Sequence, residues 1–300
     1  MYDYATVSNA SNDAVPRGVA WAFCGLFKRG KTYGAARWNP SGSTQKTLYL
    51  DAERCVLRWE EYAGMTVLPI TSFNPPKESD GKIIPPDKRG YIVNGETKKA
   101  WSLKEAIAII KAMVKNGDLA KHFEIVVIDS VDALQKWAEE SYLDEINKNK
   151  EKDEQVFSIG DVPHGAAWSD ARNALVNPLV ELRNLVTSVG VDIGFVIHSK
   201  TTTQVANKWQ RDPALRAGVT NALFGEIDAI GYIDVEESIK DDGAVFGTVY
   251  QGHMHTISFN IYGEILTGGI RMNKLVNKTF PFAYKAIEEE YKKLSTTKEK

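Results

Sequence analysis

The sequence lacks the features that mark secreted, membrane-spanning or strongly basic proteins. Its two cysteines, Cys24 and Cys55, sit in or beside apolar segments, so we interpret them as buried thiols and expect no disulfide. No apolar run reaches about 18 residues and no signal-peptide region opens the chain, so neither export nor a membrane span is predicted. The formal net charge is only −2, so contact with nucleic acid would need a local basic patch.

What is present is the composition of an ordinary globular protein. The chain has 300 residues, of which 43% are hydrophobic and 25% charged. That length is enough for one α/β domain with a sizeable core, or for one domain plus an appendage. Composition therefore limits the class of protein but assigns no function, and the motifs must do so.

A phosphate-binding loop stands out between a short apolar run and a helix-forming segment. The pattern G-x-x-x-x-G-K-[ST] is matched by Gly25, Leu26, Phe27, Lys28, Arg29, Gly30, Lys31 and Thr32. The two glycines let backbone N–H groups point at phosphates, Lys31 reaches the terminal phosphates, and the Thr32 hydroxyl ligates Mg²⁺. We expect ATP and Mg²⁺ here, with nucleotide contacts from residue 25 to Tyr33.

A second strand end supplies an acid for the metal. The β-branched run 123–128 is followed by Asp129 and Ser130, the Walker B form in which a central parallel strand delivers a carboxylate to the Mg²⁺ shell. Many buried strands end in Asp for turn formation alone. The P-loop about a hundred residues earlier makes the pair specific, so Asp129 is the predicted metal ligand with Thr32.

Two further acids follow another short strand. Asp51 and Glu53 stand two residues apart after the run 47–50, so on an extended end their side chains point the same way. Hydrolysis needs a group that polarises the attacking water, and Glu53 could serve. Spacing alone leaves open a solvated helix N-terminus, where acids are favoured by the helix dipole.

These segments resemble those of RecA-family ATPases. The matching stretches are 50–53 and 127–134, and a later strand, 191–198, ends in His198 before Ser199 and Lys200. The resemblance covers about residues 15 to 235. RecA itself has Gln at the position of His198, so the chain looks more like the short, core-only RecA-like ATPases of bacteriophages, some of which are single-strand annealing recombinases.

The resemblance implies roles for these residues. In that family the acid after the second strand is the catalytic base, which implies Glu53. The polar residue that ends the later strand senses the γ-phosphate and leads into a DNA-binding loop, which implies His198. Together with Lys31, these form the expected catalytic set. The implied fold is a RecA-like P-loop NTPase, with a mostly parallel twisted sheet flanked by helices and antiparallel strands added toward the C-terminus.

The segment 198–218 is the expected nucleic-acid element. It holds four cations against one acid, and an aromatic residue lies among them. The predicted DNA contacts are Lys200, Lys208, Trp209 and Arg211. Cations grip phosphates and an aromatic ring stacks on bases without needing a particular sequence. The composition also fits a nucleotide-sensing loop whose cations pair with a neighbouring subunit, and Trp168 could either stack on a base or simply begin a long helix.

The chain divides into three expected parts. Residues 1–16 form a flexible arm, 17–285 the RecA-like ATPase domain, and 286–300 a charged tail. An insertion at 71–101 carries the hairpin signal Asn94-Gly95. A capping box, Ser102 to Glu105, then opens an amphipathic helix. Arg271 and Lys274 offer cations that an oligomer could insert into an adjacent nucleotide site.

The sequence thus predicts a cytoplasmic ATPase that acts on single-stranded DNA in phage recombination or replication, by annealing or strand pairing. A homo-oligomeric ring or filament is expected, and a single-strand-binding protein is a possible partner. Two alternatives stay open: a ring-forming helicase-type motor, and a nucleotide-gated assembly factor that binds no DNA. A small-molecule kinase is disfavoured by the long sheet and by the loop after His198.

Overall fold

The computed structural model describes most of the chain. The described residues are 15, 17–26, 29–58, 62, 64–162, 166–200, 203–205, 208–210, 212–239, 250–259, 275 and 278–296. Of the expected N-terminal arm only Val15 is among them, and it is buried against the core.

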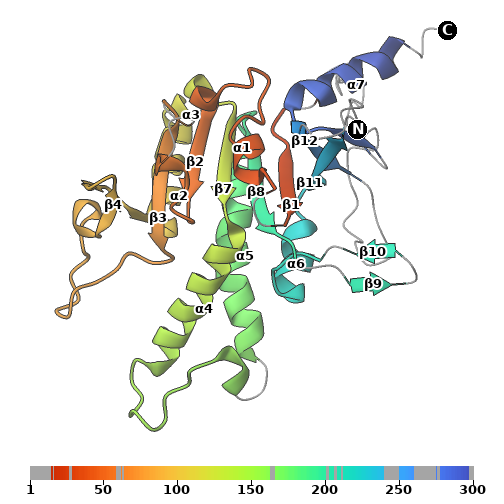
Figure 1. Ribbon diagram of the computed structural model, residues 1–300. Helices are drawn as coiled ribbons and strands as arrows, with labels where there is room; N and C mark the ends of the chain where they lie inside the picture. Colours follow the sequence, from red (N-terminus) through yellow and green to blue (C-terminus); the bar gives the residue numbers. More distant parts are fainter. Residues whose placement is uncertain are drawn as a thin grey trace, which may run out of the picture.

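A nine-stranded sheet forms the centre of the molecule (Figure 1). Its strand order is β13-β12-β11-β1-β8-β7-β2-β3-β6. The strands are β1 (Ala20–Gly25), β2 (Thr47–Asp51), β3 (Thr66–Ser72), β6 (Trp101–Ser102), β7 (Ile125–Asp129), β8 (Asp192–His198), β11 (Ala229–Ile239), β12 (Tyr250–Ser258) and β13 (Thr279–Pro281). From β11 to β6 all neighbours are parallel, whereas β12 and β13 are antiparallel. The predicted fold class is confirmed.

Helices cover both faces of this sheet. One face packs against α2 (Leu103–Lys115), α3 (Asp118–His122), α4 (Val131–Asn147), α5 (Ala166–Thr187) and α6 (Ala217–Phe224). The other face packs against α1 (Lys31–Ala35) and α7 (Tyr284–Thr296). Among the described residues, no helix is both long enough and apolar enough to cross a lipid bilayer.

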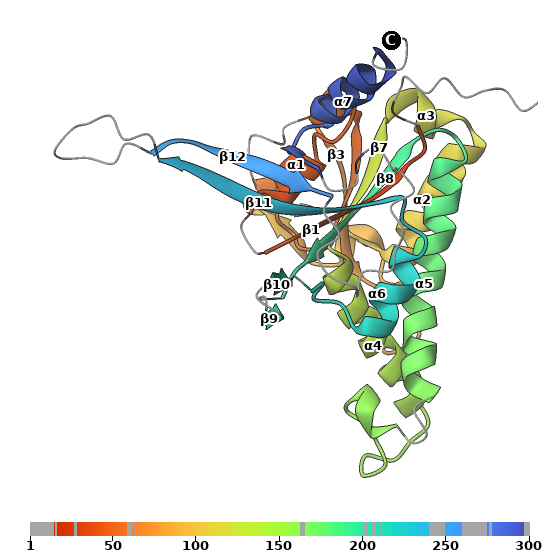
Figure 2. The ribbon, with the colours of Figure 1, turned by 90° about the vertical axis from the view of Figure 1, so that its right-hand side faces the viewer.

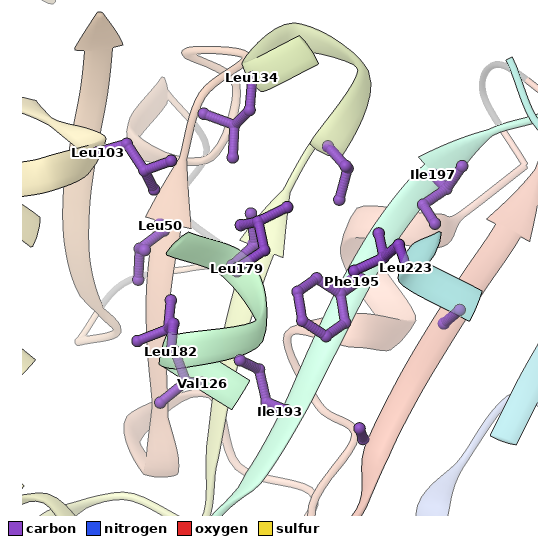
Figure 3. Packing of buried hydrophobic residues seen from close by; sticks show 14 of the residues in the cluster. Leu50, Leu103, Val126, Leu134, Leu179, Leu182, Ile193, Phe195, Ile197 and Leu223 are labelled. Atoms are coloured by element: carbon purple, nitrogen blue, oxygen red, sulfur yellow. The ribbon is translucent and has the colours of Figure 1, made fainter. Parts of the chain in front are cut away.

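Strand periodicity assigns the side chains to the two faces. Along β1, Ala20, Ala22 and Cys24 join the first core, and Trp21 and Phe23 join the second, because successive side chains of a strand point to opposite faces. Figure 3 shows the first core, in which leucines of α5 lie against residues of β7 and β8. The second core is aromatic, with the Trp21 and Trp38 ring centres 5.2 Å apart.

The insertion at 71–101 carries the predicted hairpin. Strands β4 (Tyr91–Val93) and β5 (Glu96–Lys98) pair antiparallel around Asn94 and Gly95. Both turn residues have positive φ, 50° and 83°, as a two-residue hairpin turn requires. The predicted capping box is also confirmed: the Ser102 hydroxyl accepts a hydrogen bond from the Glu105 backbone N–H, and the Glu105 carboxylate accepts one from the Ser102 backbone N–H.

One segment end differs from the sequence expectation. Most of the expected tail, 286–300, belongs to helix α7, because Tyr284, Ile287 and Tyr291 form a stripe at helical spacing that is buried against the sheet. The segment is rich in charged residues, but helical spacing places its apolar residues on one face.

Two pairs of elements extend away from the sheet (Figure 2). Helices α4 and α5 run side by side beyond the ends of the parallel strands, and β11 and β12 form a long two-stranded ribbon. A short separate hairpin of β9 (Thr203–Val205) and β10 (Lys208–Gln210) follows β8. Because β1, β8, β7 and β2 pair in parallel, their carboxyl ends lie at one edge of the sheet, and this hairpin lies beside that edge.

Candidate nucleotide site

The P-loop leaves the central strand β1 at its carboxyl end and enters α1 at Lys31. Gly30 precedes the helix with φ 76°, in the left-handed region that favours glycine. A side chain at Gly25 would lie 2.9 Å from the carbonyl oxygen of Ile233 on neighbouring β11, so the first glycine is required by strand packing. Phe27 and Lys28 lie outside the described residues.

Lys31 is folded against its own loop. Its Nζ donates a hydrogen bond to the Leu26 carbonyl oxygen at 2.6 Å, and the residue is 5% exposed. Burial lowers the pKa of Lys31, and the nearby carboxylates of Asp129 and Glu53 act against that shift. The ammonium group thus occupies a desolvated pocket where additional negative charge, such as a phosphate, would be favourable.

The remaining residues at the loop lie toward the surface. Arg29 forms an ion pair with Asp234 of β11 at 3.7 Å. Tyr33 is 44% exposed, and the guanidinium of Arg37 stacks 3.8 Å from the centre of its ring. Tyr33 therefore stands at the start of α1 as an aromatic ring that is accessible to a ligand.

Asp129 receives two hydroxyl hydrogen bonds at the end of β7. Thr32 Oγ1 donates to its Oδ2 at 2.7 Å, and the Tyr49 hydroxyl donates to the same oxygen at 2.6 Å. Burial raises the pKa of Asp129 to about 6, although both hydrogen bonds lower it. Sequence reasoning missed Tyr49; the available signal was a tyrosine inside the apolar strand 47–50, since a buried phenol needs a partner.

The donor set fits a hard cation. A hydroxyl and a carboxylate, Thr32 and Asp129, come together beside the P-loop, and Mg²⁺ prefers such oxygen ligands. Across the part of the chain that the structure describes, no cluster of three or more His, Cys, Asp or Glu side chains could hold a metal ion alone. A nucleotide-bound Mg²⁺ takes one or two protein ligands and completes its shell with phosphates and water.

The two acids after β2 have different surroundings. Asp51 is fully buried, and its carboxylate accepts hydrogen bonds from the backbone N–H groups of Cys55 and Val56, both at 3.2 Å. The Glu53 side chain is 32% exposed and accepts a hydrogen bond from Ser130 Oγ at 2.5 Å. Asp51 therefore shapes the loop, whereas Glu53 faces the end of β7.

His198 ends β8 beside Glu53. Its Nδ1 lies 3.4 Å from Glu53 Oε1 and 3.2 Å from Asp132 Oδ2. The His198 backbone N–H also donates to Asp132 Oδ2 at 2.8 Å. The structure thus brings together Lys31, Thr32, Glu53, Asp129 and His198 at one edge of the sheet, and adds Asp132, which the motif search did not single out.

The chain between His198 and Ala214, called the excursion below, is closed at its base by backbone hydrogen bonds. The His198 carbonyl oxygen accepts a hydrogen bond from Ala214 N at 2.6 Å, and Lys200 N donates to the Asp212 carbonyl oxygen at 2.7 Å. The chain therefore leaves after Lys200 and returns at Asp212 through one paired point. Of the predicted DNA contacts, Lys200 is exposed at this base, and Lys208 and Trp209 belong to strand β10. Arg211 lies outside the described residues, as do Arg271 and Lys274.

One cation of the basic segment is held within the chain. Arg216 Nε and Nη2 donate to the two carboxylate oxygens of Glu139 at 2.5 and 2.7 Å. Its guanidinium also lies 4.1 Å from the ring centre of Trp168, which is 39% exposed in the first turns of α5. Trp168 thus does begin the long helix, and Arg216 ties α6 to α4 and α5.

Comparison with known proteins agrees with this architecture. The family model described as AAA domain (AAA_24) matches residues 18–260. No curated protein matches the chain. A KaiC-like protein, PH0186, from the hyperthermophilic archaeon Pyrococcus horikoshii OT3 is 12% identical with a TM-score of 0.42, over 89% of this chain and 86% of that one. This structural similarity is too low to support an argument about fold or function. The family match, in contrast, spans most of the sequence. This protein therefore belongs to the AAA domain family and is a P-loop ATPase with a RecA-like fold.

Proposed function

We propose that the protein is a Mg²⁺-dependent ATPase that couples ATP binding and hydrolysis to binding of single-stranded DNA. Thr32 and Asp129 hold Mg²⁺, and Lys31 and the P-loop backbone bind the phosphates. Glu53 accepts a proton from the attacking water. The physiological work is annealing or strand pairing in bacteriophage recombination or replication, in the host cytoplasm, as a homo-oligomer and beside a single-strand-binding protein.

The position of His198 supports the proposed coupling of the nucleotide site to the excursion most directly. His198 contacts the nucleotide edge through its side chain, which lies 3.4 Å from Glu53 Oε1. It contacts the base of the excursion through its carbonyl oxygen, which accepts the hydrogen bond from Ala214. A change in this residue on loss of the γ-phosphate would reach the excursion without any intervening residue, and two sites that bias one element are coupled in both directions.

The choice of DNA as the partner rests on the composition of the excursion. Lys200, Lys208 and Arg211 supply cations for phosphates, and Trp209 supplies a ring for base stacking. The net charge of the whole chain does not attract nucleic acid, so these residues must supply the contacts locally. This combination suits a single strand because its bases are accessible for stacking.

The test is the ATPase rate without DNA, with single-stranded DNA and with duplex DNA. We expect stimulation by the single strand, and weaker DNA binding with a flatter salt dependence in Lys200→Ala/Lys208→Ala. Each lost phosphate contact lowers the slope of log K against log salt by about 0.7. The control is Lys115→Ala/Lys121→Ala, two exposed cations at the ends of α2 and α3, on the far side of the sheet from the excursion (Figure 1).

The same assay separates the alternatives. Stimulation mainly by duplex DNA, accompanied by strand separation, would replace annealing with a helicase-type motor. No stimulation by either DNA, with unchanged binding in the charge variants, would contradict the proposal and favour a nucleotide-gated assembly factor.

A further inference from the structure

Asp132 lies in the first turn of α4 and makes two contacts to His198. Its Oδ2 accepts a hydrogen bond from the His198 backbone N–H at 2.8 Å and lies 3.2 Å from Nδ1 of the same residue. An acid in the first turn of a helix is often explained by the helix dipole alone. Here Ser130 already caps the helix through the Ala133 N–H, so Asp132 is not needed as the cap.

These contacts define the orientation of the imidazole. Nδ1 of His198 faces two carboxylate oxygens, Asp132 Oδ2 at 3.2 Å and Glu53 Oε1 at 3.4 Å. Ionised carboxylates only accept hydrogen bonds, so Nδ1 must carry a hydrogen to bond either of them. Asp132 and Glu53 therefore compete for one N–H group, and Asp132 is the closer of the two.

We propose that Asp132 is a positioning residue for hydrolysis: it fixes the tautomer and orientation of His198 and draws the Nδ1–H away from Glu53. The inference rests on the proposed role of Glu53 as the base. A carboxylate that accepts a strong hydrogen bond loses basicity. Glu53 already accepts one bond from Ser130. By holding the imidazole N–H, Asp132 leaves the remaining acceptor capacity of Glu53 to the attacking water.

The first test compares Asp132→Ala and Asp132→Asn with wild type in ATP turnover. We expect kcat to fall by about tenfold to a hundredfold, the range typical of losing a partner that orients a functional side chain. The KM for ATP should change less than kcat, because the hydrogen bond and the ion pair of Asp132 described here go to His198, and its charge acts on Lys31 less than those of Asp129 and Glu53 do. Asp118→Asn, the first-turn acid of α3, is the matched control and should retain full turnover.

A double-mutant cycle distinguishes positioning from a merely structural role. If Asp132 acts through the imidazole, Asp132→Ala should have little further effect on kcat in a His198→Gln background. Equal losses of kcat in both backgrounds would mean that Asp132 only holds the end of β8, and would overturn the inference.

Glu53→Gln, measured in parallel, separates this inference from the proposed function. If Glu53→Gln loses turnover while Asp132→Ala keeps the wild-type kcat, the positioning role is wrong and the base assignment stands. If Glu53→Gln keeps full turnover, the proposed base fails, and the inference fails with it.

Discussion

Two aspartates at opposite edges of the sheet have the same exposed fraction and the same shift in pKa. Asp129 ends β7 at the carboxyl edge and Asp192 begins β8 at the amino edge, and each is 1% exposed. Burial raises the pKa of both to about 6. A perturbed pKa is commonly used to find functional sites, but here it does not distinguish the two positions.

The donors that face each acid do distinguish them. Asp192 accepts hydrogen bonds from the backbone N–H groups of Gly18 and Val19 and from the indole of Trp21. Asp129 accepts its bonds from the hydroxyls of Thr32 and Tyr49. A hydroxyl can rotate and become a ligand itself, whereas a backbone N–H is fixed. The amino edge therefore stabilises the fold, whereas under the proposed function the carboxyl edge exchanges its hydroxyl donors for Mg²⁺ and phosphate.

The largest expected effect is at the carboxyl edge. Lys31→Ala should abolish measurable ATP binding because it removes the charge that faces the phosphates. Its unfolding free energy should stay within about 1 kcal/mol of wild type, since burial of the ammonium is already unfavourable in the free protein. Calorimetric titration with ATP and chemical denaturation measure the two quantities. Unchanged nucleotide affinity would remove the central assignment.

The second prediction separates the two acids after β2. Glu53→Gln keeps the shape and removes basicity, so ATP should still bind while turnover falls about a hundredfold or more. Asp51→Asn should instead lower the unfolding free energy by about 1–3 kcal/mol, because an amide nitrogen would face the N–H groups of Cys55 or Val56. Full turnover in Glu53→Gln with the large kinetic loss in Asp51→Asn would reverse the assignment.

The third prediction concerns the amino edge and carries the pH dependence. At pH 5, Asp192→Asn should lower the unfolding free energy by about 1–3 kcal/mol, because the amide nitrogen cannot accept the hydrogen bond from the Trp21 indole N–H. In wild type the raised pKa means that the folded state keeps a proton that the unfolded state releases. The stability from Asp192 is thus fully present below about pH 4 and declines as pH rises through about 6.

The measurable consequence is a stability difference between wild type and Asp192→Asn that becomes smaller as pH rises. The difference in unfolding free energy between wild type and Asp192→Asn should shrink from pH 4 to pH 7, in denaturation curves recorded without nucleotide. ATP affinity per folded molecule should be unaffected, because Asp192 lies at the opposite edge from the P-loop. A gap that widened with pH would show that the ionised carboxylate is the favoured form.

The smallest effect is expected from Tyr49→Phe. The change removes one of the two hydroxyl donors to Asp129 and nothing else from a buried ring, so the unfolding free energy should fall by about 1 kcal/mol. ATP turnover should persist, because Thr32 and Asp129 remain. If Tyr49→Phe abolished turnover, the phenol would have a direct part in the reaction, and the view of Asp129 as an acid with exchangeable donors would need revision.

The sequence was most informative where chemistry demands fixed spacing. The P-loop, the hairpin turn at Asn94 and the capping box at Ser102 could be located because each depends on residues close in the chain. Asp129 could be located because a P-loop implies a second strand that ends in an acid. Tyr49 and Asp132 were missed because their partners lie 80 and 66 residues away. Helix α7 was missed since its apolar stripe becomes meaningful only when the sheet covers it.

The closed base of the excursion after β8 has a consequence for how this protein can change. Its chain leaves and re-enters at a single paired point, between His198, Lys200, Asp212 and Ala214. Loops anchored in this way tolerate insertion and replacement, because the scaffold beneath them does not depend on their sequence. Under the proposed function, the sequence carried between Lys200 and Asp212 can therefore diverge, or be engineered, while the strand ends that hold the P-loop, Glu53 and Asp129 stay the same.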